Sequence, residues 1–202
     1  NIQHMQNRIE VFYDTSDRVV SLGKTPYLFN ARGCVIQRGE ERFVYNNFGQ
    51  LTRAVRADQY DIKYFYDAKG RLLIRKDHLG NFTQYFYGDI ERPHLITHMF
   101  NNANEVITSI IYDDSQVPIM AQVNHQNYYI ASDHLGSPLL IYDQRGNVVK
   151  EINRGPYGHV IFDSNPSFYI PIGFQGGIPD QITGIVHFHG SYIYDSLIGQ
   201  WL

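Results

Sequence analysis

A short phrase, Tyr-Asp-x-x-Gly-Arg-Leu at residues 66–72, recurs along the chain in complete and softened forms. The copies are Tyr13-Asp14, Phe29-Asn30 with Gly33, Tyr45-Asn46 with Gly49, Tyr66-Asp67 with Gly70, Tyr112-Asp113 without a glycine, and Tyr142-Asp143 with Gly146. Several intervals between copies fall near 16 or 21 residues. Self-similar units of this length stack against one another, so the phrase favours a repeat architecture over a single-core globule.

A second phrase, Asp-His-Leu-Gly, occurs at residues 77–80 and again at 133–136. Catalytic residues usually occur once in a chain, whereas scaffold residues recur with the repeat. We therefore expect Asp133, His134 and Gly136 to shape a turn by hydrogen bonding and packing, and not to supply an acid–base pair.

Residues 60–74 show what one unit is expected to form. Every second residue over 60–66 is aromatic or apolar, with Asp61, Lys63 and Phe65 between them, a period of two that places Tyr64 and Tyr66 on one face of a strand. Asp67 can bond the backbone of the following turn, and Gly70 tolerates a positive φ at its fourth position. Residues 71–74 then resume the strand. Because an isolated hairpin is marginally stable, neighbouring hairpins must pair.

The composition agrees with a chain of strands. It includes 16 Tyr, 12 Phe and 17 Gly in 202 residues, and aromatic side chains suit a pleated, half-buried surface. No capped stretch has apolar residues at helical spacing, and residues 180–185 are expected to form one short turn at most. The sequence therefore predicts an all-β fold built from repeated β-hairpins.

Charge and cysteine content exclude several classes of protein. The formal net charge is −3 with both signs interspersed, so the chain lacks the basic stripe of a nucleic-acid-binding protein. No run of about 18 apolar residues could span a membrane. Cys34 is the single cysteine, which excludes an internal disulfide framework, and we expect it to pack as a small buried apolar residue.

The composition and motifs of the sequence change along the chain. We expect residues 1–125 to hold the repeats and residues 126–202 to form a distinct closing segment, because glycine and proline become frequent after 155. The chain begins at Asn1-Ile2-Gln3-His4 and stops at Trp201-Leu202 in the style of an internal sequence. We therefore expect it to be a fragment of a larger domain.

The recurring phrase resembles the YD repeat shared by bacterial Rhs proteins, the C components of Tc toxins and animal teneurins. Residues 132–138, 155–158, 173–177 and 194–201 resemble the Rhs-associated core that ends such arrays. The resemblance covers essentially the whole chain. It is closest to teneurins at residues 127–136 and 157–165 and in the terminal Trp201, and it suggests an invertebrate member.

The resemblance implies a fold, a place and a set of partners. The fold would be a large spiralling β-shell in the extracellular part of a single-pass plasma-membrane receptor. Family members mediate homophilic contacts with teneurin-type receptors on apposing cells and heterophilic contacts with latrophilin-type adhesion receptors, and they match neurons at synapses. The chain would be a non-catalytic part of that shell and would need no cofactor.

A toxin-encapsulating shell of the bacterial Rhs or Tc type is the alternative. Bacterial cores usually read Arg-Tyr-Tyr-Asp before a terminal Gly-Arg, whereas this chain has Ser191, Ile193 and Gln200 in that region. The bacterial self-cleavage motif would lie beyond Leu202, so no protease residues are carried over. An enzymatic function is the weakest hypothesis, because no serine lies in a nucleophile elbow and no catalytic constellation is apparent.

Two further features suggest sites. Asn81-Phe82-Thr83 matches the acceptor pattern for N-glycosylation and follows Gly80 at an expected exposed hairpin tip. His187 and His189 would share one strand face and could supply half of a metal site, but no further ligand has suitable spacing. Asp113-Asp114 lacks the spacing of a calcium loop. We therefore expect a glycan at Asn81 and no metal site.

Overall fold

The computed structural model describes residues 10–202, so the expectation about Asn1 to His4 lies outside the described part. Sixteen strands form one sheet in chain order: β1 (Val11–Tyr13), β2 (Val19–Leu22), β3 (Thr25–Phe29), β4 (Val35–Arg38), β5 (Glu41–Tyr45), β6 (Leu51–Arg56), β7 (Tyr60–Tyr66), β8 (Leu72–Lys76), β9 (Phe82–Phe86), β10 (His98–Asn101), β11 (Val106–Tyr112), β12 (Pro118–Val123), β13 (Gln126–Ser132), β14 (Pro138–Tyr142), β15 (Val148–Arg154) and β16 (Val160–Asp163). We call this sheet the wall. Its strands pair antiparallel with their sequence neighbours, as consecutive hairpins do.

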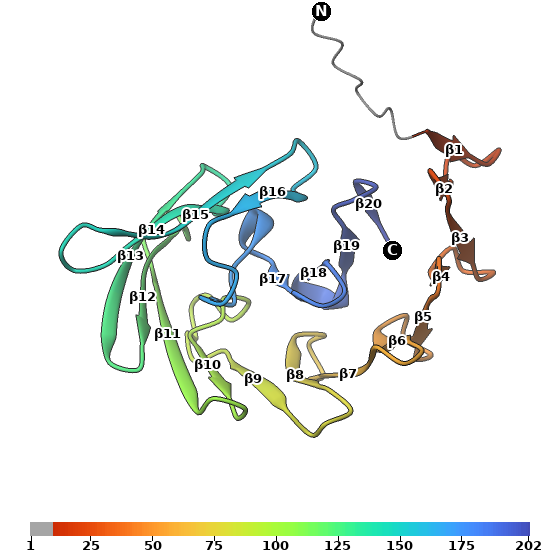
Figure 1. The fold of residues 1–202 in the computed structure, drawn as a ribbon. Coiled ribbons are helices and arrows are strands. Elements are labelled where there is room, and N and C mark those ends of the chain that lie inside the picture. Colours follow the sequence, from red (N-terminus) through yellow and green to blue (C-terminus); the bar gives the residue numbers. More distant parts are fainter. Residues whose placement is uncertain (1–9) are drawn as a thin grey trace, which may run out of the picture.

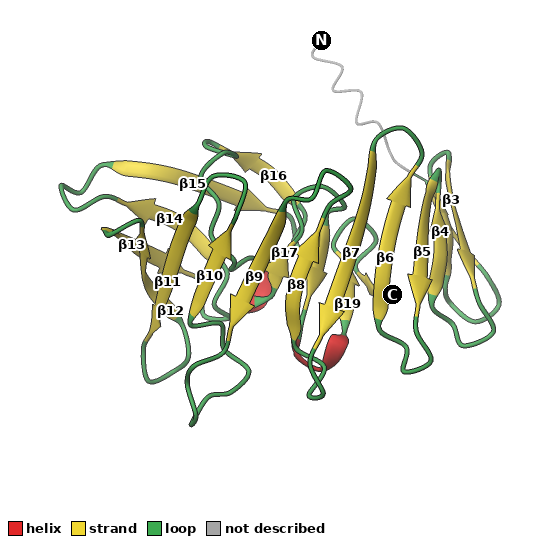
Figure 2. Cartoon of the chain, turned by 90° about the horizontal axis from the view of Figure 1, so that it is seen from below, coloured by secondary structure: helices red, strands yellow, loops and turns green. Residues whose placement is uncertain are grey.

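The wall curves around the remainder of the chain, residues 164–202, which we call the inner segment (Figure 1). The inner segment holds a four-stranded sheet of β17 (Ile178–Pro179), β18 (Ile185–His187), β19 (Ile193–Asp195) and β20 (Gln200–Trp201). Two single 3-10 turns, η1 (Phe174–Gly176) and η2 (His189–Ser191), flank its strands. Neither turn is long or apolar enough to cross a membrane, and no other helix occurs among the described residues. Figure 2 shows the wall strands lying side by side.

The predicted turn chemistry is confirmed in detail. Asp67 Oδ1 accepts hydrogen bonds from the backbone N–H groups of Lys69 and Arg71, both at 2.9 Å, and Gly70 N–H donates to Asp67 O at 3.0 Å. Gly70 has φ +75°, the left-handed conformation that glycine adopts without a Cβ penalty. The strand register shifts at Tyr66, because the left-handed residue leaves one extra residue opposite the partner strand.

The copies without glycine keep the same turn. Asp17 (φ +58°) and Gln116 (φ +66°) adopt the left-handed conformation in the copies that begin at Asp14 and Asp113. In each copy the aspartate Oδ1 accepts a backbone hydrogen bond from the residue four positions later. The aspartate therefore sets the turn, and glycine lowers its conformational cost.

Tyrosine hydroxyls connect several neighbouring units of the wall. Three tyrosine hydroxyls donate to a backbone carbonyl of an earlier unit at 2.9 Å: Tyr45 to Val35, Tyr87 to Leu72 and Tyr112 to Ile96. Tyr13 is 57% exposed, because β1 is the first strand of the wall and no earlier described strand lies beside it. Of the three hydroxyl donors, Tyr45 and Tyr112 belong to the recurring phrase, whereas the hydroxyl of Tyr66 of the phrase lies 3.5 Å from His187 Nδ1 of the inner segment.

Similar phrases lie on opposite edges of the wall. Because neighbouring strands run antiparallel, the turns after odd-numbered strands share one edge, which we call the capped edge. The turns at Asp67 and Asp133 belong to the capped edge, whereas those at Asp77 and Asp143 follow even-numbered strands and lie on the other. The phrase therefore predicts where the chain turns, but it does not predict on which edge of the wall the turn lies.

The predicted division between repeats at 1–125 and a closing segment at 126–202 stays a prediction, because the strand pairing does not mark it. Strand pairing continues without a break through β16, and the architecture changes after Asp163, where the chain enters the curve of the wall. Inward side chains of the wall, such as Ile62 and Tyr64, pack with Ile185 and Ile193 of the inner segment in one buried cluster. The inner segment therefore supplies part of the core.

Candidate functional site: the seam between wall and inner segment

The inner segment is hydrogen-bonded to several turns of the capped edge, those after β1, β5, β7, β13 and β15. Five hydrogen bonds make these contacts: Gln200 Nε2 to Asp17 O, Ser191 Oγ to Gly70 O, Gln50 Nε2 to Ser191 Oγ, Gln175 N to Ser137 Oγ, and Tyr194 Oη to Tyr157 O. The contacted turns span most of the wall. The seam therefore closes that edge, and it is where residues far apart in sequence meet.

A buried arginine forms the first of two charged clusters that join the wall to the inner segment away from the capped edge. Arg38 is 6% exposed and pairs with Asp195 (Nη1 to Oδ2, 2.8 Å) and Glu41 (Nε to Oε2, 2.5 Å). It also donates to Thr183 O, and Tyr27 Oη donates to Asp195 Oδ2 at 3.3 Å. Burial by itself would lower the pKa of the Arg38 guanidinium, but the bond to Glu41 and the charge of Asp195 raise it. The cluster stays charged and joins β4 to β19.

The second cluster joins β7 and β8 to the inner segment. Arg75 Nε lies 2.8 Å from Asp180 Oδ2, and Tyr64 Oη donates to the same oxygen at 2.7 Å. Burial would raise the pKa of the Asp180 carboxyl, yet the charge and hydrogen bond of Arg75 hold it below its usual value. The carboxylate is therefore ionised and fully engaged in holding the inner sheet.

His187 lies beside this cluster and is uncharged. Its ring centroid is 4.6 Å from that of Tyr64, and its Nδ1 lies 3.5 Å from Tyr66 Oη. Burial lowers the pKa of His187 to about 4.

Removing one partner of a buried ion pair such as Arg38–Asp195 costs about 3–5 kcal/mol, because the other charge is left unpaired. These clusters thus fix where the inner sheet docks.

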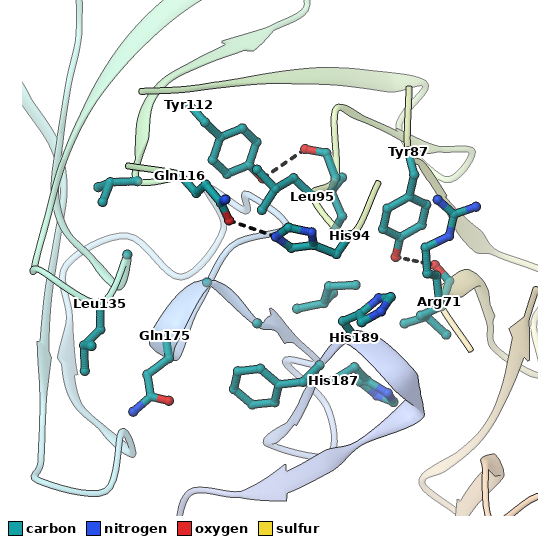
Figure 3. A pocket seen from close by; sticks show the side chains of 18 of the residues that line it. Arg71, Tyr87, His94, Leu95, Tyr112, Gln116, Leu135, Gln175, His187 and His189 are labelled. Carbon is teal, nitrogen blue, oxygen red and sulfur yellow. Dashed lines mark hydrogen bonds between the residues drawn. The ribbon is translucent and has the colours of Figure 1, made fainter. Parts of the chain in front are cut away.

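A cavity of about 300 Å³ opens at the seam (Figure 3). His94 and Gln116 approach it from the wall, with His94 Nε2 2.9 Å from Gln116 Oε1, and His189 and Gln175 approach it from the inner segment. The rings of His94 and His189 have centroids 6.0 Å apart.

The expected placement of the two histidines is wrong. His187 ends β18 and is buried, whereas His189 begins η2 and is exposed, so they do not share a strand face. The described residues contain no group of three or more His, Cys, Asp or Glu that could hold a metal ion. His189 instead meets His94, a partner that sequence spacing did not indicate.

The expected role of Asp133 in a turn is confirmed. Its Oδ1 accepts hydrogen bonds from Leu135 N and Ser137 N, both at 2.9 Å, and Gly136 has φ +82°. Burial would raise the pKa of Asp133, but the Ser137 N–H lowers it overall. His134 is exposed at the mouth of the cavity.

Two expected environments need correction. Asn81 is half-buried and not fully exposed: its Nδ2 donates to Asp77 Oδ2 at 2.9 Å, because the Asp-x-x-Gly turn folds the next side chain back onto the aspartate. Thr83, the third residue of the glycosylation pattern, is 6% exposed. Cys34 is half-buried, not buried, because it follows the left-handed Gly33 at the edge of the wall. A glycan at Asn81 stays a prediction.

The charged residues of the seam were not predicted. Arg38 and Arg75 occupy inward positions of their strands, directly opposite the inward Tyr27 and Tyr64. The local signal was incomplete: the residue two positions earlier is apolar in both cases (Ile36 and Leu73), but the residue two positions later is acidic (Glu40 and Asp77). Their acidic partners in the inner segment, Asp195 and Asp180, lie 157 and 105 residues away, and no local pattern connects them.

The fold and seam define a class: a curved β-wall of Tyr-Asp hairpins whose open edge is closed by an internal segment of the same chain. The family model described as teneurin YD-shell matches residues 1–202. The chain belongs to this family.

Curated relatives agree. Teneurin-m of Drosophila melanogaster is 39% identical over 191 residues, which are 94% of this chain and 7% of the relative. Teneurin-1 of Gallus gallus is 39% identical and that of Homo sapiens 38%, with the same coverage. The chain thus spans about 7% of the length of these relatives.

Solved structures share the fold. A TcdB2-TccC3 crystal structure matches with a TM-score of 0.68 at 18% identity over 86% of this chain and 10% of that one. A Photorhabdus luminescens Tc holotoxin pore matches with a TM-score of 0.71 at 17% identity over 95% of this chain and 12% of that one. At this identity the likeness concerns the fold, and it supports the expected β-shell.

Proposed function

We propose that this chain is a structural, non-catalytic segment of a teneurin-like adhesion receptor, in the extracellular part of a single-pass plasma-membrane protein. The observation that carries the proposal is the match of the teneurin YD-shell family over all 202 residues. In this role the segment closes one edge of the shell and supports recognition between cells. The proposed partners are teneurin-type receptors and latrophilin-type receptors on apposing cells, including partner matching at synapses.

The physical contribution of the segment is rigidity. The buried pairs Arg38–Asp195 and Arg75–Asp180 lock the inner sheet against the wall, and the tyrosine hydroxyls link one unit to the next. A wall held in this way presents any attached or outward-facing contact surface in a fixed orientation. Fixed presentation lowers the entropy lost when two cell surfaces bind.

A cell-aggregation assay tests the proposal. Cells that display the complete protein are mixed with like cells and with cells that display a latrophilin-type receptor, and a surface epitope tag measures display. We expect aggregation for the wild type and its loss when residues 1–202 are deleted with display preserved. Aggregation that survives the deletion would contradict a supporting role for this segment.

A point variant makes the assay sharper. Arg38→Met leaves Asp195 buried without its charged partner. The control, Arg53→Met, removes an exposed ion pair of the wall: Arg53 is 44% exposed and lies 2.6 Å from Asp61. We expect Arg38→Met to reduce aggregation and Arg53→Met to leave it unchanged. Equal behaviour of the two variants would show that the docking of the inner sheet against the wall is irrelevant to adhesion.

A toxin-encapsulating shell is the second candidate, favoured by the likeness in fold to TcdB2-TccC3. The sequence that follows Leu202 in the complete protein separates the two candidates. Paired Asp-Pro-x-x-Gly motifs there, together with release of a C-terminal fragment from the purified protein, would support the toxin shell and contradict the adhesion role.

A further inference from the structure

A second cavity, of about 430 Å³, lies between β15, β16 and the inner segment. Its lining is mainly apolar and includes Phe168, Ile170, Ile172, Phe174, Val186 and Leu197. Ile170 and Ile172 are each 3% exposed, so the apolar wall is part of the folded core, whereas Leu197 is 54% exposed at the opening. Sites for small organic molecules have this character: hundreds of cubic ångströms, apolar walls and a few polar groups.

The wall contributes charged groups to the same cavity. The alternation of β15 turns Lys150, Ile152 and Arg154 inward, and all three line the cavity. Lys150 is satisfied, because its Nζ lies 2.7 Å from Asp163 Oδ2 and donates to two backbone carbonyls. Asp180, at the far side, is satisfied by Arg75.

Arg154 lacks such a partner. Among the described residues, every other half-buried or buried arginine has a carboxylate within 4 Å, and the arginines without one, Arg32, Arg42 and Arg145, are exposed. Arg154 is half-buried, and its one protein hydrogen bond runs from Nη1 to Pro138 O. Burial lowers its pKa, and the more distant charges of Asp133 and Asp163 offset this effect only in part. A half-buried guanidinium has donors in a fork that fits a carboxylate.

We propose that this cavity binds a small amphipathic carboxylate, an organic acid whose apolar tail packs against Ile170, Ile172 and Phe174 and whose carboxylate pairs with Arg154. The apolar lining provides the affinity for the tail. The unpaired guanidinium selects an anionic head group over a cationic or neutral one. Because Lys150 and Asp180 are already paired, Arg154 is the group that decides the sign of the ligand charge. This activity is independent of the proposed adhesive role.

Titration calorimetry on the complete protein tests the proposal, with sodium decanoate as the probe and decylammonium chloride as the probe with the same tail and opposite charge. We expect saturable binding of decanoate and weaker binding of decylammonium. Arg154→Gln keeps an N–H donor for Pro138 O but removes the charge. Since a hydrogen bond to a charged group is worth more than a neutral one, we expect it to weaken decanoate binding by about tenfold or more.

Two further variants make the test decisive. Arg42→Gln removes an exposed arginine that also lacks a carboxylate, and we expect decanoate to bind as tightly as to the wild type. Leu197→Glu places a negative charge at the opening without altering a buried residue, and we expect weaker binding of decanoate and not of decylammonium. The absence of saturable decanoate binding, or equal binding by the Arg154→Gln and Arg42→Gln variants, would overturn the proposal.

Discussion

Substituting one turn glycine tests the seam against a matched control. An ideal Cβ at Gly70 would lie 2.7 Å from Ser191 Oγ and 3.1 Å from the backbone carbon of Gly190. At Gly146, which has a similar φ of +81°, no described atom lies within 4 Å of the added Cβ. Gly70→Ala and Gly146→Ala therefore share the cost of a left-handed alanine, about 1–2 kcal/mol, but only the first displaces the inner segment.

The extra cost at Gly70 can be estimated from the bonds it disturbs. Ser191 Oγ donates to Gly70 O at 3.0 Å and accepts from Gln50 Nε2 at 2.8 Å. Losing both costs about 2 kcal/mol, at about 1 kcal/mol for each hydrogen bond. The local opening of the inner segment should then become about thirtyfold more frequent, since about 1.4 kcal/mol is a factor of ten.

Hydrogen exchange on the complete protein measures this opening. We expect Gly70→Ala to speed exchange across residues 185–202 and Gly146→Ala to affect the hairpin of β14 and β15 alone. If both variants changed exchange in residues 185–202 equally, or if neither did, the docking of η2 against the turn at Gly70 would be wrong.

Three other predictions concern a hydroxyl contact, a buried histidine and the outermost strands of the wall. Tyr87→Phe should lower the free energy of local opening between β8 and β9 by about 1 kcal/mol, because its hydroxyl donates to Leu72 O, whereas the exposed Tyr129→Phe should not; hydrogen exchange measures both. The folded state holds the pKa of His187 near 4, below its ordinary 6.5, so the unfolded chain binds the proton more readily. The free energy of unfolding should therefore fall as the pH drops from about 6.5 toward 4, by up to about 3 kcal/mol. Denaturant titrations of wild type and His187→Phe at pH 7 and pH 4.5 should show a smaller loss for the variant, and an equal loss would refute this role. Residues 1–202 alone should self-associate, because β1 and β16 each lack a second pairing strand among residues 10–202; a monodisperse monomer in sedimentation would count against this.

The part of the fold that local chemistry determines was predictable. The Asp67 side chain, the left-handed Gly70 and the alternation of β7 all act within a few residues, so the hairpins and their turns could be inferred from the phrase itself. The persistence of the turn at Gln116 follows the same logic, since the aspartate supplies the hydrogen bonds there too.

The seam was not predictable, because its contacts join distant residues. Arg75 meets Asp180 only after the wall has curved and the inner segment has entered it, and nothing near either residue marks the other. The two edges of the wall were equally hidden: the turns at Asp77 and Asp133 have the same phrase and lie on opposite edges. Topology, not sequence similarity, decides which turns contact the inner segment.

Electron cryomicroscopy of the complete protein would test the central claim, that this chain is the closed part of a larger β-shell. The account predicts that β1 and β16 pair with further strands and that residues 164–202 lie inside the wall, with Ser191 against Gly70 and Arg75 against Asp180. Free edges at β1 and β16 in the complete protein, or an inner segment outside the curve of the wall, would contradict it.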